Sequence, residues 1–314
     1  MKKLTRILCL LLAAFLLTAC SEKAEPPAQT EPEDDTLSIL TSFYPIYAVA
    51  VNILDGVPDM QLSCLVQPQD GCLRNYRISD LDAALIASCD GIIIGGKGLE
   101  SFEGALGSLE DGPAVIYLLD GLTLKNNGKN ADSDEATHMD GDNPWLFLSV
   151  SGAIQMAISL GYGMGELDEQ YADLYLANMQ DFVDRCEALI REMHAQLRNC
   201  NTDTPVAVIH EGLSYLTSEL NLNLVCEFMR ESGTDLYDND LEALLNELEA
   251  SGAKVILAEK QLPMNLKEAL TGAGYRVALI DTLTTHTADG DKTVYEKAML
   301  NNAKAIAEAV RSVQ

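Results

Sequence analysis

The stretch YADLYLANMQDFVDRCEALIREMHAQL, residues 171–197, carries apolar side chains at helical spacing along its whole length. These side chains are Tyr171, Leu174, Tyr175, Met179, Phe182, Val183, Cys186, Leu189, Ile190, Met193 and Leu197. Neither Gly nor Pro interrupts the segment between Asp168 and Asn199. A helix of that length spans about 45 Å, which is more than one small lobe needs internally. The sequence therefore predicts a long connecting helix, placed over residues 161–200, between two lobes.

Apolar runs alternate with helical patterns on both sides of this helix. In the N-terminal half, strands are predicted at residues 37–41, 60–65, 91–94 and 114–117, with helices near 46–54, 79–88 and 99–108. In the C-terminal half, strands are predicted at 206–209, 222–228, 254–258 and 276–280, with helices near 212–220, 239–251, 264–272 and 293–313. This alternation favours parallel sheets with helices on both faces.

We therefore predict an α/β protein with two doubly wound lobes, residues 37–160 and 201–314, joined by one long helix. Each lobe is expected to contain a parallel four-stranded sheet. Open sheets of this kind bind ligands at the carboxyl ends of their strands. The expected site is therefore the cleft between the lobes.

The amino terminus has the features of an export signal. Three basic residues precede an apolar run, residues 7–17, which is shorter than the roughly 18 residues that a membrane span requires. Small residues then lead to Cys20, an arrangement that resembles a bacterial lipoprotein box. We expect residues 1–19 to be removed and Cys20 to be lipidated, with an ordinary signal peptide as the alternative. The Pro- and acid-rich residues 20–36 are expected to form a disordered tether.

The composition argues against several classes of function. The formal net charge is -27, and loss of the basic signal makes the rest of the chain still more acidic, which argues against nucleic acid as a partner. The sequence contains no Gly-x-Ser-x-Gly, no phosphate-binding glycine loop and no His-Glu-x-x-His. We therefore expect a binding protein with no catalytic cofactor, and not an enzyme.

Several short segments, taken in order, resemble one family. They are TSFYPIY at residues 41–47, GGKGLE at 95–100, HEGLSY at 210–215 and IDTL at 280–283, followed by Tyr295, Met299 and Asn302. With the long helix between them, they resemble the substrate-binding lipoproteins of zinc and manganese ABC importers, the cluster A-I group. The resemblance covers nearly all of residues 37–312 and implies a clamp that holds a divalent metal between its lobes.

The resemblance implies four metal ligands, two from each lobe. In the C-terminal lobe, His210 and Asp281 each follow an apolar strand and match the family's histidine and carboxylate. An imidazole and a carboxylate suit zinc or manganese. The alternatives are a loop histidine without a ligand role and an aspartate that forms a turn or a helix cap.

The N-terminal lobe departs from the family pattern. Where the family has two histidines, this sequence has Leu73 and Trp145, neither of which can ligate a divalent metal. Candidate replacement ligands are Cys72, His138, His286 and Glu211, and His138 lies in a polar loop that can equally be solvated. A changed cargo is the alternative, because Tyr44, Tyr76 and Trp145 can line a cleft for an organic or chelated ligand.

The resemblance implies a receptor on the extracytoplasmic face of a cell membrane, held there by the lipid on Cys20. Its cargo is expected to be a divalent metal. Zinc is favoured over manganese because the thiolate of Cys72, a candidate ligand, suits zinc. Its partners are expected to be an ABC permease and an ATPase.

Overall fold

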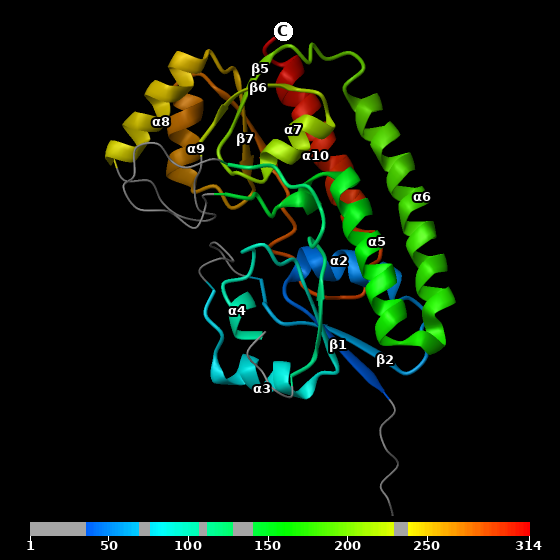
Figure 1. Cartoon of the computed structure of the whole chain (residues 1–314). Coiled ribbons are helices and arrows are strands. Elements are labelled where there is room, and N and C mark those ends of the chain that lie inside the picture. The colour runs from blue at the N-terminus through cyan, green and yellow to red at the C-terminus, as the bar shows by residue number, and fades with distance from the viewer. Residues whose placement is uncertain (1–35, 69–75, 107–111, 128–140, 229–237) are drawn as a thin grey trace, which may run out of the picture. The chain divides into compact units, whose positions relative to one another are not determined.

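The computed structural model describes residues 36–68, 76–106, 112–127, 141–228 and 238–314 (Figure 1). The predicted signal peptide, Cys20 and nearly all of the predicted tether lie outside these residues. Among the described residues, no helix combines the length and the apolar character needed to cross a membrane.

The N-terminal lobe contains one parallel sheet of four strands in the order β2-β1-β3-β4. The strands are β1 (Leu37–Thr41), β2 (Met60–Cys64), β3 (Gly91–Ile94) and β4 (Ala114–Tyr117). The helices that follow the first three are α2 (Tyr44–Ile53), α3 (Asp80–Ser88) and α4 (Glu103–Leu106). The interior strand β3 reads GIII and is buried throughout, as expected for a parallel strand covered on both faces.

The C-terminal lobe repeats this topology, with a parallel sheet in the order β6-β5-β7-β8. The strands are β5 (Pro205–Val208), β6 (Asn223–Glu227), β7 (Val255–Glu259) and β8 (Arg276–Ile280). The helices are α7 (Leu213–Glu219), α8 (Asp238–Ser251), α9 (Met264–Gly272) and α10 (Val294–Arg311). Two four-stranded parallel sheets with intervening helices confirm the predicted fold class.

Both faces of the C-terminal sheet are buried, against different partners. Ile256 belongs to an apolar cluster with Leu244 of α8 and Leu266 of α9. Its neighbour Val255 belongs to a second cluster that includes α10 and continues through α6 into the N-terminal lobe. Figure 1 shows α8 and α9 on one side of this sheet and α7 and α10 on the other. A continuous apolar core therefore links the two lobes.

The predicted connecting helix is α6 (Ala172–Gln196), whose 25 residues span about 37 Å. Its buried side chains are Tyr175, Phe182, Cys186, Leu189 and Met193. The predicted range 161–200 differs from the structure at its start. Residues 161–167 belong to a separate helix, α5 (Val150–Leu167), which packs alongside α6 after a short 3-10 turn, η3 (Glu169–Tyr171).

Helix α5 escaped prediction because four glycines interrupt its pattern, and glycine disfavours a helix interior. The structure shows that these glycines permit close packing. A Cβ at Gly161 would lie 2.9 Å from the Met179 sulfur on α6, and one at Gly163 would lie 2.9 Å from Ile116 Cγ2 on β4. The glycines thus let α5 fit between the sheet and α6.

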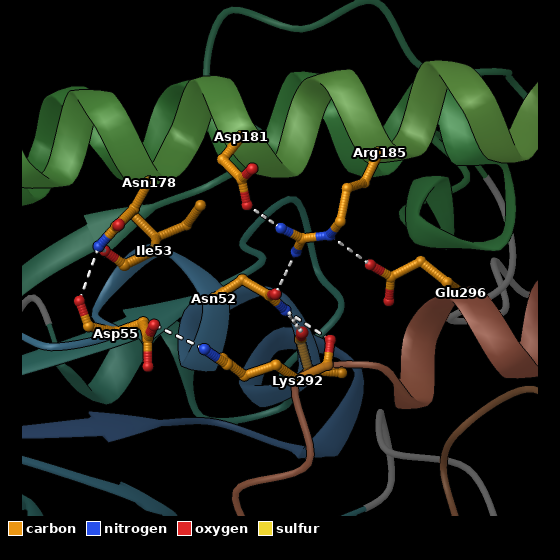
Figure 2. A network of polar contacts seen from close by, with 9 residues as sticks. Asn52, Ile53, Asp55, Asn178, Asp181, Arg185, Lys292 and Glu296 are labelled. Atoms are coloured by element: carbon orange, nitrogen blue, oxygen red, sulfur yellow. Dashed lines mark hydrogen bonds and ion pairs between the residues drawn. The ribbon is translucent and has the colours of Figure 1, made fainter.

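A polar network centred on Arg185 joins α6 to both lobes (Figure 2). The Arg185 Nε donates to Glu296 Oε1 at 3.0 Å, near the start of α10. Its terminal nitrogens donate to Asp181 on α6 and to Asn52 near the end of α2. One guanidinium therefore contacts the N-terminal lobe, the connecting helix and the C-terminal lobe.

Neighbouring side chains extend the same network. Asn178 Nδ2 donates to the backbone oxygens of Ile53 and Asp55 at 3.0 and 2.8 Å (Figure 2). Lys292 Nζ donates to Asp55 Oδ2 at 2.6 Å. Because these bonds cross between segments that are far apart in the chain, they hold the lobes against α6.

Candidate functional site

His210 and Asp281 lie at one edge of the C-terminal sheet, where its parallel strands end. His210 follows β5 by two residues, and Asp281 comes directly after β8. Both are buried, with 3% and 6% of their surface exposed. Strand β7 lies between β5 and β8, so its last residue, Glu259, and the following Lys260 lie at the same edge of the sheet as the two predicted ligands.

The Asp281 carboxylate is surrounded by three donors. Lys260 Nζ lies 2.7 Å from Oδ2, and the Leu283 backbone N–H donates to Oδ1 at 2.9 Å. His286 Nε2 lies 3.2 Å from Oδ1 and 3.1 Å from Oδ2. Burial alone raises the pKa of Asp281, but the bonds from Lys260, Leu283 and His286 outweigh it and lower the pKa. The carboxylate is therefore held ionised, and it also forms the turn that was the alternative role for this residue.

His286 connects Asp281 to the N-terminal lobe. Its ring stacks on Tyr44, the first residue of α2, with ring centroids 5.3 Å apart and planes 23° apart. Tyr44 is itself buried, and burial followed by the charges of Asp289 and Asp291 raises its pKa. The structure thus brings together Asp281, the candidate ligand His286 and the predicted cleft residue Tyr44.

His210 is packed against Trp145, which the resemblance places at a histidine position of the family. Its ring meets the Trp145 ring edge to face, with centroids 4.6 Å apart. The backbone N–H of Gly212 donates to His210 Nδ1 at 3.1 Å, which fixes the orientation of the ring. Trp145 is 2% exposed and also packs on Phe147.

Glu211 is buried and bound to the same tryptophan, rather than placed at a solvated rim. Trp145 Nε1 donates to Glu211 Oε1 at 2.7 Å, and Asn127 Nδ2 donates to Oε2. Asn143 Nδ2 holds the backbone oxygen of Glu211 at 2.9 Å. Both carboxylate oxygens of this candidate ligand therefore already accept hydrogen bonds.

Gly212 allows Trp145 to approach this closely. A Cβ at residue 212 would lie 2.5 Å from Trp145 Cβ, which is bonded directly to the backbone, and 2.7 Å from Leu148 Cδ1. The glycine that follows His210 and Glu211 is thus matched to the bulk of the indole.

The remaining predicted residues separate into two groups. Tyr76 contacts the N-terminal lobe, with its hydroxyl donating to Asp82 at 2.9 Å and its ring edge-on to Phe102 at 6.3 Å. Cys72, His138 and Leu73 lie outside the described residues. Within the described ranges, no group of three or more His, Cys, Asp and Glu side chains is placed to hold a metal.

Two charged side chains with contacts at these sheet edges were not among the predicted site residues. Lys260 follows β7 directly. A polar residue just after a predicted strand is visible in the sequence and could have identified Lys260. Glu100 is 2% exposed and accepts from Ser42 Oγ and from the backbone N–H groups of Gly95 and Gly96, at 2.7 to 2.9 Å. It fixes the loops after β1 and β3, which are at the corresponding edge of the N-terminal sheet.

Glu100 gives a test of this arrangement through pH. Burial raises its pKa, more than the hydrogen bonds from Ser42, Gly95 and Gly96 lower it. A raised folded-state pKa stabilises the fold below the unfolded pKa of about 4.3, and this stabilisation is lost as pH rises through the folded pKa. We expect Glu100→Gln to flatten the fall in unfolding free energy above that pH, measured by urea denaturation across pH 4 to 8. An unchanged pH slope would contradict this assignment.

Comparisons with known proteins agree with this architecture. The family model described as "Zinc-uptake complex component A periplasmic" matches residues 39–309. The high-affinity zinc uptake system protein ZnuA of Brucella abortus is 21% identical over 156 residues, which are 49% of this chain and 46% of that protein. The chain thus spans about half the length of the curated relatives it matches.

Two solved structures share the fold. FpvC of Pseudomonas aeruginosa, in complex with Mn2+, has a TM-score of 0.77 at 23% identity and covers 89% of this chain and 100% of that one. A ZnuA crystal structure has a TM-score of 0.69 at 21% identity and covers 88% of this chain and all of that one. Because the family model matches far more than half of the residues, the chain belongs to the ZnuA family of zinc-uptake components.

Proposed function

We propose that the chain is the substrate-binding component of an ABC importer and that its cargo is a divalent metal, with zinc favoured. The observation that carries this proposal is the placement of His210 and Asp281, both buried at the same edge of one parallel sheet. Family membership supports the same role. The protein would bind its cargo and release it, and it would not transform it.

The donor set explains why zinc is favoured. His210 would supply a ring nitrogen, and Asp281 would supply a carboxylate oxygen. A tetrahedral zinc site needs four donors, so two more are required. His286 is the described candidate, because its Nε2 already lies 3.1 Å from Asp281. Cys72 and His138 are the sequence candidates, and a thiolate from Cys72 would favour zinc over manganese.

We also infer where the chain is located and which proteins it works with. Cys20 would carry the lipid that holds the chain at the extracytoplasmic face of the cell membrane, with residues 21–36 as a tether. Delivery would require a membrane permease and an ATPase. The acidic net charge of -27 supports a cation as cargo and argues against nucleic acid.

A zinc titration of purified protein tests the proposal. We expect binding at micromolar or tighter affinity, and a loss of at least about tenfold in His210→Ala and in Asp281→Ala, because each removes a direct ligand from a site with few donors. His194→Ala is the matched control, since His194 lies on α6 and its removal should leave affinity unchanged.

Two outcomes would contradict the proposal. Failure of the unaltered protein to bind zinc or manganese in calorimetry would remove the metal as cargo. Equal affinity in the unaltered protein and in both ligand variants would place the metal elsewhere. Cys72→Ser and His286→Ala, measured in the same way, identify which side chain completes the site.

A further inference from the structure

We propose that Lys260 is an internal competitor for the metal site, so that cargo binding must displace its ammonium group from Asp281. This inference rests on the proposed function and adds a residue that tunes the affinity of the same site. It starts from the closest contact of the Asp281 carboxylate, the 2.7 Å bond from Lys260 Nζ to Oδ2.

The position of Lys260 follows from the sheet. Its backbone N–H donates to the Ile280 oxygen at 2.9 Å, which continues the pairing of β7 with β8 by one residue. This pairing places the side chain beside Asp281, the residue after β8. The contact therefore follows from the register of the interior strand β7 against the edge strand β8. A metal bound to Asp281 would lie next to the Lys260 ammonium.

The carboxylate cannot serve both cations equally. Oδ1 already accepts the Leu283 N–H at 2.9 Å, and Oδ2 accepts Lys260 at 2.7 Å. A metal bound through Oδ2 would take the lone pair that the ammonium uses, and the two positive charges would repel each other at this range. Lys260 must therefore move away from Asp281, or its charge lowers the affinity of the site for the metal.

Displacement is feasible because the two partners differ in exposure. The Lys260 side chain is 55% exposed, whereas that of Asp281 is 8% exposed. The flexible lysine can turn into water, where its ammonium is readily hydrated, and the bound metal would replace it as the positive charge beside the buried carboxylate. The buried carboxylate stays in place, fixed by the Leu283 N–H and by Asn302, which bonds the Asp281 backbone N–H and oxygen at 2.8 and 2.9 Å.

The predicted consequence is that Lys260→Met tightens zinc binding by about fivefold, because methionine keeps the stem of the side chain and removes the competing charge. Lys260→Arg keeps a cation beside Asp281 and is expected to bind zinc as the unaltered protein does. Lys292→Met is the matched charge control, since Lys292 forms an ion pair of similar length, 2.6 Å, with Asp55 instead of Asp281.

Zinc calorimetry on the purified chain and these three variants distinguishes the outcomes. Tighter binding in Lys260→Met alone, relative to an unaltered chain that itself binds zinc, supports the inference. If zinc binds the unaltered chain and Lys260→Met does not tighten it, or Lys260→Arg or Lys292→Met tightens it equally, the inference is wrong and the proposed function stands. If zinc binds neither the unaltered chain nor Lys260→Met, both are wrong.

Discussion

Trp145→Ala is expected to lower the free energy of unfolding by about 4 kcal/mol, the typical cost of deleting a buried aromatic side chain. Trp145 is 2% exposed and packs against His210 and Phe147 at centroid distances of 4.6 and 5.6 Å. Its removal also leaves the buried Glu211 without the indole donor at 2.7 Å. The loss is measured by urea denaturation at neutral pH.

Trp145→Phe separates the two contributions. Phenylalanine keeps most of the aromatic volume but cannot donate to Glu211, so the expected loss is about 2 kcal/mol. A loss below about 1 kcal/mol for Trp145→Ala would mean that the indole is not a packed element of the cleft. That result would contradict the packing of Trp145 against His210 and Phe147.

Arg185→Ala is expected to destabilise the protein by about 3 kcal/mol, because hydrogen bonds to charged groups contribute more than neutral ones. The guanidinium donates to Glu296 at 3.0 Å and also contacts Asp181 and Asn52, so one substitution opens contacts to both lobes. Its Cζ also lies 5.6 Å from the Phe182 ring centroid. Urea denaturation again provides the measurement.

Arg191→Ala is the matched control on the same helix, where the residue is exposed. We expect its effect to stay within about 0.5 kcal/mol, as is usual for an exposed position. Equal effects at the two positions would show that the network of Figure 2 contributes no more than a surface charge does.

The strands were the most predictable part of the fold. Runs such as GIII at 91–94 and VILAE at 255–259 are buried along their whole length, and apolar runs this short favour a strand over a helix. Helix α6 was predictable because its apolar positions keep one period over several turns. Helix α5 was not, since the fit of Gly161 against Met179 exists only in the folded protein.

The candidate site divides in the same way. His210 and Asp281 were predictable because each follows a buried strand, and parallel strands end at a common edge. The hydrogen bond between Trp145 and Glu211 joins residues 66 positions apart, so no local sequence pattern predicts it. The pairing of Lys260 with Asp281 depends on the register of β7 against β8, which sequence periodicity does not provide.

These contacts suggest how the clamp departs from a simple four-ligand site. The Trp145 indole donates to the buried Glu211 carboxylate at the position where the resemblance implies a histidine. The predicted ligand Asp281 is hydrogen-bonded to Lys260 and His286. In our proposal, the metal would therefore bind mainly through the C-terminal lobe, in exchange for Lys260.

Zinc-edge anomalous diffraction from crystals of the zinc-loaded protein is the most direct test of this account. We predict one strong peak about 2.0 to 2.2 Å from both a His210 ring nitrogen and an Asp281 oxygen, the usual lengths of zinc–nitrogen and zinc–oxygen bonds. The Lys260 ammonium should have moved off Asp281 in the same map. A peak away from these two residues, or no peak beside them, would contradict the proposal that His210 and Asp281 hold the metal.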